Sequence, residues 1–221
     1  MRLPPEVPVM TLPNVILFPQ VMQPLHIFEP RYRRMLADAL ASHRMFAIAM
    51  SARGRRRNRP PRVAGLGLIR ASVEGVDGTS NLILQGIARV ELGEAIRGRP
   101  YHLHRMRPLP PAGRGSVEAA ALAAKVMELV GERLELGFGP PPALAGPLGE
   151  PTAVQALRDV LKHLAHLDDP EQLADLVSAT LLPDARERQV ILETRRLEDR
   201  LRFLIVFLRH EIENRGNSQS E

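Results

Sequence analysis

The feature that most constrains the fold of this chain is a change in the spacing of its apolar residues near residue 110. Before that point, short apolar runs are separated by turn residues, a pattern that favours β-strands. Beyond it, apolar residues recur at three- and four-residue steps, which is the period of an amphipathic helix. A Pro/Gly-rich stretch at residues 108–113 separates the two patterns and is typical of a linker. We therefore predict an α+β protein with a β-rich subdomain at 1–110, a helical bundle at 114–215 and a tail at 216–221.

The first half contains a series of strand-like runs interrupted by one helix. The runs are residues 15–18, 46–50, 63–73, 82–92 and 101–106. Asp77-Gly78 predicts a hairpin turn, and Gly86 interrupts a run in a way that favours a bulge or bend. Pro30 suits the first position of the helix, which carries an apolar stripe. Several short strands with such turns favour a barrel or a sandwich.

The second half contains the start signals of several helices. Ser116 and Asp169 are suitable N-caps, and Asp184 with Glu187 resembles a capping box. Further along, one apolar series repeats at three- and four-residue steps: Val190, Leu197, Leu201, Leu204 and Leu208. This series predicts the buried seam of a long C-terminal helix, and we expect the helices to form a bundle.

Charge is distributed unevenly along the chain. The net charge is +5, but residues 1–110 hold 17 Lys/Arg and 7 Asp/Glu, giving +10, whereas residues 111–221 hold 13 and 18, giving −5. The densest positive segment is a loop that contains Arg53, Arg55, Arg56, Arg57, Arg59 and Arg62. Such a loop either attracts RNA phosphates or an acidic partner in a salt-sensitive way, or is a self-repelling solvated segment. Phe46 is the nearest aromatic residue and is expected to be buried, so platforms for stacking bases are lacking.

The composition excludes several kinds of site and location. The chain has no cysteine, so it has no disulfide, no Cys-ligated zinc and no thiol nucleophile. Pro4 and Pro5 interrupt the N-terminal segment before a signal peptide could form. The longest apolar run, Phe203–Leu208, is far shorter than the roughly 20 residues that a membrane span needs. We therefore expect a soluble, cytoplasmic protein with no membrane partner.

Two pairs of histidines have spacings that permit metal binding. His163 and His166 are three residues apart in a predicted helix, and His102 and His104 share one face of a predicted strand. Each pair lacks the third defined ligand that zinc sites usually have, so structural roles are favoured. We expect no metal and no cofactor.

Two segments near the N-terminus resemble a known family. They are residues 12–19, LPNVILFP, and residues 25–32, LHIFEPRY. Together with Asp77-Gly78 and the segment GIARV at residues 86–90, they are similar to the LON domain, the N-terminal substrate-recognition module of the Lon protease family. The LON portion of cereblon is similar as well. The resemblance implies a PUA-like β-barrel followed by a helical bundle, and a role in recognising unfolded or tagged proteins.

Two departures from the family pattern bear on the fold. Gln20 stands where the family often has Gly after a Phe-Pro pair, so the turn there is expected to differ. Thr194 begins a helix junction where the family tends to have a Ser/Thr-Asp pair. This second departure leaves open whether the final helix is continuous or broken.

The catalytic machinery of Lon proteases is missing from the sequence. An AAA+ ATPase needs a glycine loop that ends in Gly-Lys-Ser/Thr, but neither Lys125 nor Lys162 has a glycine beside it. The peptidase needs a serine nucleophile with a lysine base, and no serine segment matches that pattern. We therefore predict no enzymatic activity.

The predicted function is the binding of proteins or peptides. The residues expected to line an apolar groove for an unfolded peptide are Phe18, Met22, Leu25, Phe28 and Tyr32. Met is flexible and suits surfaces that bind many partners, but most of these residues are alternatively core, since apolar residues are usually inside. The expected partners are unfolded or specific protein clients, with the chain acting as an adaptor for a separate protease. The alternative function is RNA binding through the basic barrel and the Arg-rich loop.

Overall fold

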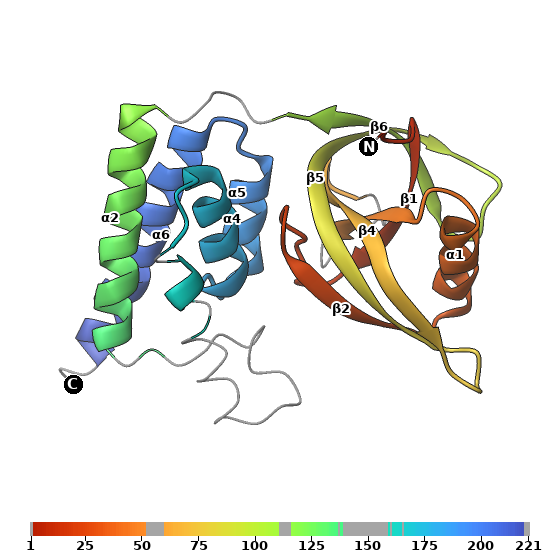
Figure 1. Cartoon of the computed structure of the whole chain (residues 1–221), viewed down its shortest axis with the longest axis horizontal. Helices are drawn as coiled ribbons and strands as arrows, with labels where there is room; N and C mark the ends of the chain where they lie inside the picture. The colour runs from red at the N-terminus through yellow and green to blue at the C-terminus, as the bar shows by residue number, and fades with distance from the viewer. Residues whose placement is uncertain are drawn as a thin grey trace. The chain divides into compact units, whose positions relative to one another are not determined.

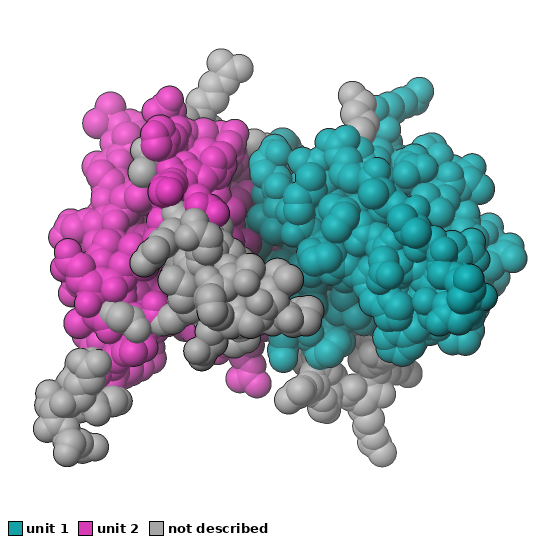
Figure 2. Space-filling model, turned by 60° about the horizontal axis from the view of Figure 1, so that its bottom comes forward, with its two compact units in different colours: residues 1–110 teal, residues 111–221 magenta. Residues whose placement is uncertain are grey.

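A computed structural model describes residues 2–51, 60–110, 116–136, 138, 159, 161–164 and 166–218. The chain divides into two compact units, residues 1–110 and residues 111–221, which Figure 2 shows in teal and magenta. Unit 1 contains the strands and one helix, and unit 2 contains the remaining helices (Figure 1). No helix among the described residues is long and apolar enough to span a membrane.

Unit 1 is built on one six-stranded sheet. In chain order its elements are β1 (Glu6–Leu12), β2 (Met22–Ile27), α1 (Pro30–Leu40), β3 (Met45–Met50), β4 (Val63–Glu74), β5 (Ser80–Ile96) and β6 (His102–Leu109). The strand order is β2-β5-β4-β3-β1-β6, and a further pairing of β5 with β6 closes the sheet into a ring. Among the described strands, β1 and β3 pair in parallel, and the other pairings are antiparallel. Figure 1 shows β4 and β5 curving across this ring, with α1 beside it.

The long strand β5 makes the closure possible because it pairs with three other strands. Its first part lies against β2, its last part against β6, and most of its length against β4. The predicted hairpin turn is confirmed: Gly78 has a φ of 74°, and the Asp77 side chain accepts hydrogen bonds from Thr79. The predicted bulge is confirmed too, since the register shifts between the pairs Leu66–Ala88 and Gly67–Gly86.

The predicted strand at residues 15–18 is wrong. These residues form a loop, although Leu17 and Phe18 are almost fully buried. Asn14 and Gln20, at the two ends of the run, have φ values of 60° and 68°, and such left-handed bends interrupt an extended chain. The loop packs its backbone directly on the sheet, because a Cβ atom at Gly86 would lie 1.9 Å from the carbonyl oxygen of Phe18. The apolar character of the run therefore reflects burial of a loop.

Two apolar clusters fill unit 1. One cluster joins α1 to the sheet and the buried loop, and includes Leu17, Tyr32, Met35, Phe46 and Leu84. The other is formed mainly by strand residues, such as Val7, Val9, Ala47, Leu66 and Val90. The predicted helix start at Pro30 is confirmed, and Tyr32, Met35 and Leu36 are its buried face.

The described helices of unit 2 are α2 (Val117–Glu135), α4 (Pro170–Thr180), α5 (Ala185–Glu193) and α6 (Leu197–Ser218). The three predicted N-caps are confirmed. The Ser116 hydroxyl accepts a hydrogen bond from the Ala119 amide at 3.0 Å, and Asp169 and Asp184 each accept one from the amide two residues ahead. These bonds satisfy backbone donors that the first turn of a helix leaves unpaired.

The C-terminal seam is broken into two helices. Thr194 has a ψ of 119°, which ends α5, and α6 begins three residues later. Leu201, Leu204 and Leu208 are fully buried along α6, as predicted. Val190 belongs to α5 and is 39% exposed, so its place in the predicted seam is wrong. The predicted linker also begins too early, because Pro108 still pairs with Val90 in the β5–β6 ladder.

Two buried arginines form ion pairs that hold the helices of unit 2 together. Arg200 of α6 is 1% exposed and contacts Glu171 at 2.9 Å and Asp175 at 3.4 Å, both on α4. Arg133 of α2 makes two hydrogen bonds to Glu211 of α6, at 3.0 and 3.1 Å. Since a buried guanidinium needs charged partners, these pairs fix how α2 and α4 pack on α6.

Candidate functional site

Strand β2 presents a row of uncharged side chains away from the core. Met22, Pro24, His26 and Phe28 occupy alternate positions, and successive side chains of a strand point to opposite faces. All four are exposed, Met22 by 53% and Phe28 by 61%, whereas Ile27 between the last two is buried. We refer to Met22, Pro24, His26 and Phe28 as the β2 row.

The β2 row lies on an edge strand, since β2 pairs with β5 alone among the described strands. The amide of Gly86 donates to the carbonyl of Val21 at 2.9 Å, which sets the alternation of the ladder that follows. By that alternation the amides of Met22 and His26 turn towards the free edge. Pro24 has no amide to offer there, and a proline at this position hinders the addition of another strand. This edge therefore exposes mainly side chains for contact.

The end of the β2 row is held by an aromatic contact. The rings of His26 and Phe28 stack with centroids 5.9 Å apart and an interplanar angle of 23°. His26 Nδ1 lies 2.9 Å from Oδ1 of Asn81 on β5, so the imidazole donates to the carboxamide oxygen and its plane is fixed. Phe28 lies just beyond the strand, and the stack gives its exposed ring a defined orientation.

Three of the five predicted groove residues belong wholly or partly to the core. Phe18 is fully buried, and Tyr32 is 4% exposed with its hydroxyl bonded to the backbone and side chain of Thr11. Leu25 is partly buried and packs against the core cluster that contains Tyr32. Met22 and Phe28 are therefore the predicted residues whose side chains a ligand can reach.

The sequence carries the signature of one family along nearly its whole length. The sequence model of the ATP-dependent protease La (LON) substrate-binding domain matches residues 6–210. This chain belongs to that family. The family is that of a substrate-binding domain, which is itself non-catalytic.

Curated relatives of this LON domain are Lon proteases. The chain is 25% identical over 217 residues to the Lon protease of Desulfosudis oleivorans, with 96% of this chain and 25% of that protein covered. It is 28% identical over 213 residues to Lon protease 2 of Herpetosiphon aurantiacus, with 94% and 24% covered. The chain thus spans about a quarter of the length of these relatives.

Solved structures confirm the predicted fold class. The N-terminal domain of Mycobacterium avium complex Lon protease matches with a TM-score of 0.70 at 21% identity, covering 92% of this chain and 97% of that one. A Lon N-terminal domain protein from Xanthomonas campestris matches with a TM-score of 0.64 at 18% identity, covering 91% and 98%. At these identities the comparison establishes the fold alone.

The Arg-rich loop of this LON domain lies mostly outside the described residues. Arg53, Arg55, Arg56, Arg57 and Arg59 fall there, and Arg62 is the one member that the structure describes. Its guanidinium pairs with Glu91 of β5, which is also paired with Arg107 of β6. The hydrogen bond from Arg107 is the largest cause that lowers the pKa of Glu91, and the hydrogen bond from Arg62 acts in the same direction. The pKa therefore lies below its usual range and the carboxylate stays ionised.

The histidine pairs have structural contacts. His166 Nδ1 lies 2.6 Å from the carbonyl of Lys162, one turn earlier. His104 Nδ1 lies 3.1 Å from the carbonyl of Gly93, while burial lowers the pKa of His102. Within the ranges that the structure describes, no three His, Cys, Asp or Glu side chains are placed to hold a metal ion.

Sequence reasoning missed Pro24 and His26 as members of the exposed row. The available signal was the alternation of residues 22–28 with period two, in which Leu25 and Ile27 face inward. Pro24 obscured it, because proline inside a run argues against a strand unless that strand lies at an edge.

Proposed function

We propose that this LON domain is a non-catalytic polypeptide-binding module, and that the β2 row contacts unfolded segments of its protein substrates. The observation that carries the proposal is the exposure of Met22 and Phe28 on one face of an edge strand. A contiguous exposed surface with apolar side chains can mark an interaction site, and the alternation of β2 places Pro24 and His26 between Met22 and Phe28 on the same face. Met adapts its shape to different partners, and a fixed aromatic ring offers a flat contact at low entropic cost.

A binding role without chemistry is also supported by the residues that are present. The two lysines of the sequence, Lys125 and Lys162, have no neighbouring glycine and so cannot complete a phosphate-binding loop. Lys125 lies in α2, where its amine pairs with Glu128 at 2.7 Å. An adaptor that delivers bound proteins to a separate protease fits such a role.

The test is fluorescence anisotropy with a labelled, permanently unfolded protein. The double variant Met22→Ser/Phe28→Ser is expected to bind about tenfold more weakly than the wild type, since two apolar contacts are lost from one surface. Val117→Ser is the matched control, because Val117 is 91% exposed on unit 2 and outside the β2 row. Its affinity should equal that of the wild type.

A structured RNA serves as the second ligand across a salt series. Binding of the unfolded protein that persists at high salt supports apolar contact. If the unfolded protein fails to bind while RNA binds and dissociates steeply with salt, the polypeptide-binding proposal is wrong and the RNA-binding alternative replaces it. Equal affinities of the double variant and the wild type would remove the β2 row from the site.

A further inference from the structure

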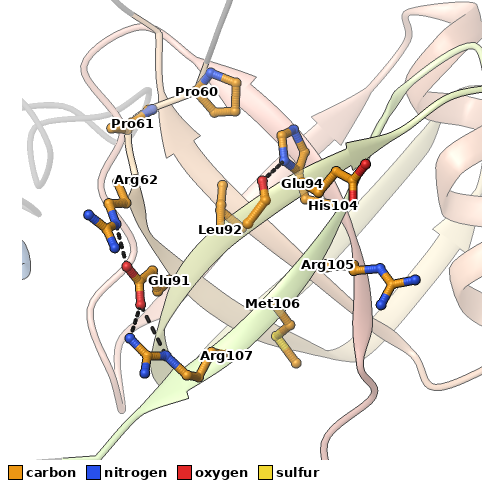
Figure 3. A pocket seen from close by; sticks show the side chains of 11 residues that line it. Pro60, Pro61, Arg62, Glu91, Leu92, Glu94, His104, Arg105, Met106 and Arg107 are labelled. Carbon is orange, nitrogen blue, oxygen red and sulfur yellow. Dashed lines mark hydrogen bonds and ion pairs between the residues drawn. The ribbon is translucent and has the colours of Figure 1, made fainter.

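Unit 1 contains a second surface feature, away from the β2 row in sequence, which Figure 3 shows from close by. It is a pocket of about 780 Å³ at the place where β5 pairs with β6. The register there jumps from the pair Leu92–Met106 to the pair Ala95–His104, so two residues of β5 stand opposite Arg105. Bulges of this kind redirect side chains and are frequent next to binding sites. We refer to this feature as the β5–β6 pocket.

One wall of the pocket is positively charged. Glu91 lies between Arg62 and Arg107 and accepts hydrogen bonds from both, which leaves a net charge of one positive unit on the three side chains. The side chains of Arg62 and Arg107 are nevertheless 79% and 71% exposed. A guanidinium has five N–H donors, so each retains donors for a second anion after its contact with Glu91.

The rest of the lining is mixed: Glu94 and Arg105 bring one charge of each sign, so the positive unit remains, and the other side chains are apolar except that of His104. Leu92, Met106 and two prolines, Pro60 and Pro61, contribute apolar surface. His104 is 5% exposed, and its Nδ1 must carry the hydrogen because the Gly93 carbonyl can only accept. In the neutral imidazole Nε2 of His104 is then an acceptor, and it has no hydrogen-bond partner among the described residues. A buried acceptor in that state favours a ligand that brings an N–H group.

We propose that the β5–β6 pocket binds an acidic side chain that neighbours an apolar residue in a polypeptide substrate. This inference rests on the proposed polypeptide-binding function and adds a charge preference to it. A peptide supplies all three complementary groups: a carboxylate for Arg62 and Arg107, an apolar side chain for Leu92 and Met106, and a backbone N–H for His104. Among the described residues that line it there is no Phe, Tyr or Trp, so this lining offers no platform on which single-stranded nucleic acids stack their bases.

The experiment compares three labelled peptides that differ at one position, which is Asp, Asn or Lys beside an apolar residue. Wild-type protein is expected to bind the Asp peptide about twofold to fivefold more tightly than the Asn peptide, the range for a partly exposed ion pair. Arg107→Gln should abolish this preference. Arg34→Gln is the matched control, because Arg34 pairs with Asp38, a carboxylate that is likewise shared with a second arginine, Arg99. It should leave the preference intact.

A charge reversal separates direct contact from the general charge of the protein. Arg107→Glu should bind the Lys peptide more tightly than the Asp peptide, whereas Arg34→Glu should not. If the Arg107 variants fail to fold, the corresponding Arg62 variants are used in their place. Equal binding of the Asp and Asn peptides to the wild type overturns the charge preference and leaves polypeptide binding standing. Failure of all three peptides overturns both proposals. The inference is contradicted if the wild type binds single-stranded RNA, if Arg107→Gln abolishes that binding, and if the wild type shows no preference for the Asp peptide. Those results would make the pocket a nucleic-acid site.

Discussion

At the scale of single residues, Gln20 shows how a residue other than glycine is accommodated at a left-handed turn position. The Val21 amide donates to the Phe18 carbonyl at 3.3 Å, with Pro19 second and Gln20 third in the turn. A φ of 68° at the third position, after proline, is that of a type II turn, where glycine is favoured. The Gln20 amide also bonds to Gly86, which joins the turn to the β2–β5 ladder. The backbone keeps the turn and Gln20 adopts the conformation that glycine would take.

Gln20→Gly is therefore expected to stabilise the protein. A residue with a Cβ atom loses roughly 1–2 kcal/mol in the left-handed region, and the larger freedom of glycine in the unfolded chain offsets part of the gain. We expect the free energy of unfolding to rise by about 0.5–1 kcal/mol in urea denaturation. Gln20→Ala keeps the Cβ atom and should show no such gain. A Gln20→Gly variant less stable than the wild type would contradict this reading of the turn.

At the scale of elements, Tyr101 links α1 to the start of β6. Its hydroxyl donates to Asp38 of α1 at 2.7 Å. Burial, and then this carboxylate, raise the pKa of Tyr101 to about 12, while the same hydrogen bond is the main cause that lowers the pKa of Asp38. The folded pKa of the tyrosine lies above its unfolded value, so its contribution to stability is complete below about pH 10 and is lost as the pH rises towards 12. The contribution of Asp38 has the opposite sign: it is present above the unfolded pKa and is lost as the pH falls through the folded value.

Tyr101→Phe should change the alkaline limb of the stability profile. At neutral pH the lost hydrogen bond is expected to lower the free energy of unfolding by about 1 kcal/mol. Between pH 10 and 12 the difference between variant and wild type should shrink, because the phenylalanine has no proton to lose. Urea denaturation at pH 7, 10 and 11.5 measures this. A constant difference across the three pH values would contradict the link between Tyr101 and Asp38.

Arg200 is the corresponding link between the helices of unit 2. Arg200→Met keeps much of the side-chain volume but leaves Glu171 and Asp175 without the buried guanidinium. Because one partner of a buried ion pair is removed, the free energy of unfolding should fall by roughly 3–5 kcal/mol. Arg202→Met is the control, because Arg202 is 50% exposed on the same helix and pairs with Asp199 and Glu118. Its cost should stay within about 1 kcal/mol. Thermal unfolding of both variants decides the matter, and similar midpoints would contradict a structural role for the Arg200 pairs.

The elements that the sequence predicts best are those whose periodicity is uninterrupted. Strands β3, β4 and β5 and the three N-caps follow directly from the spacing of apolar and capping residues. Strands β1 and β2 escaped prediction because each contains a proline, Pro8 and Pro24, and proline in a run argues against a strand. Closure of the sheet came from the family resemblance, since it depends on long-range pairing between β5 and β6 that no local spacing encodes.

At the scale of the whole molecule, prediction of the site was limited by burial. An apolar residue in a loop or strand has the same sequence signature whether it fills the core or faces a ligand. Phe18 and Met22 illustrate this: the first is fully buried, and the second is 53% exposed four residues later. The basic character of the first half was visible from composition, but the pairing of Arg62 and Arg107 around Glu91 required the fold.

The claim that the β2 row binds unfolded polypeptide is tested most directly by NMR. Backbone amide shifts of the labelled protein would be followed while a permanently unfolded protein is added. We expect the largest changes at Met22, His26 and Phe28 and at Asn81, which accepts a hydrogen bond from His26. The changes should be half complete when the free ligand concentration equals the dissociation constant found by anisotropy. Changes confined to residues 116–218, or no changes at saturating ligand, would contradict the β2 row as the binding surface.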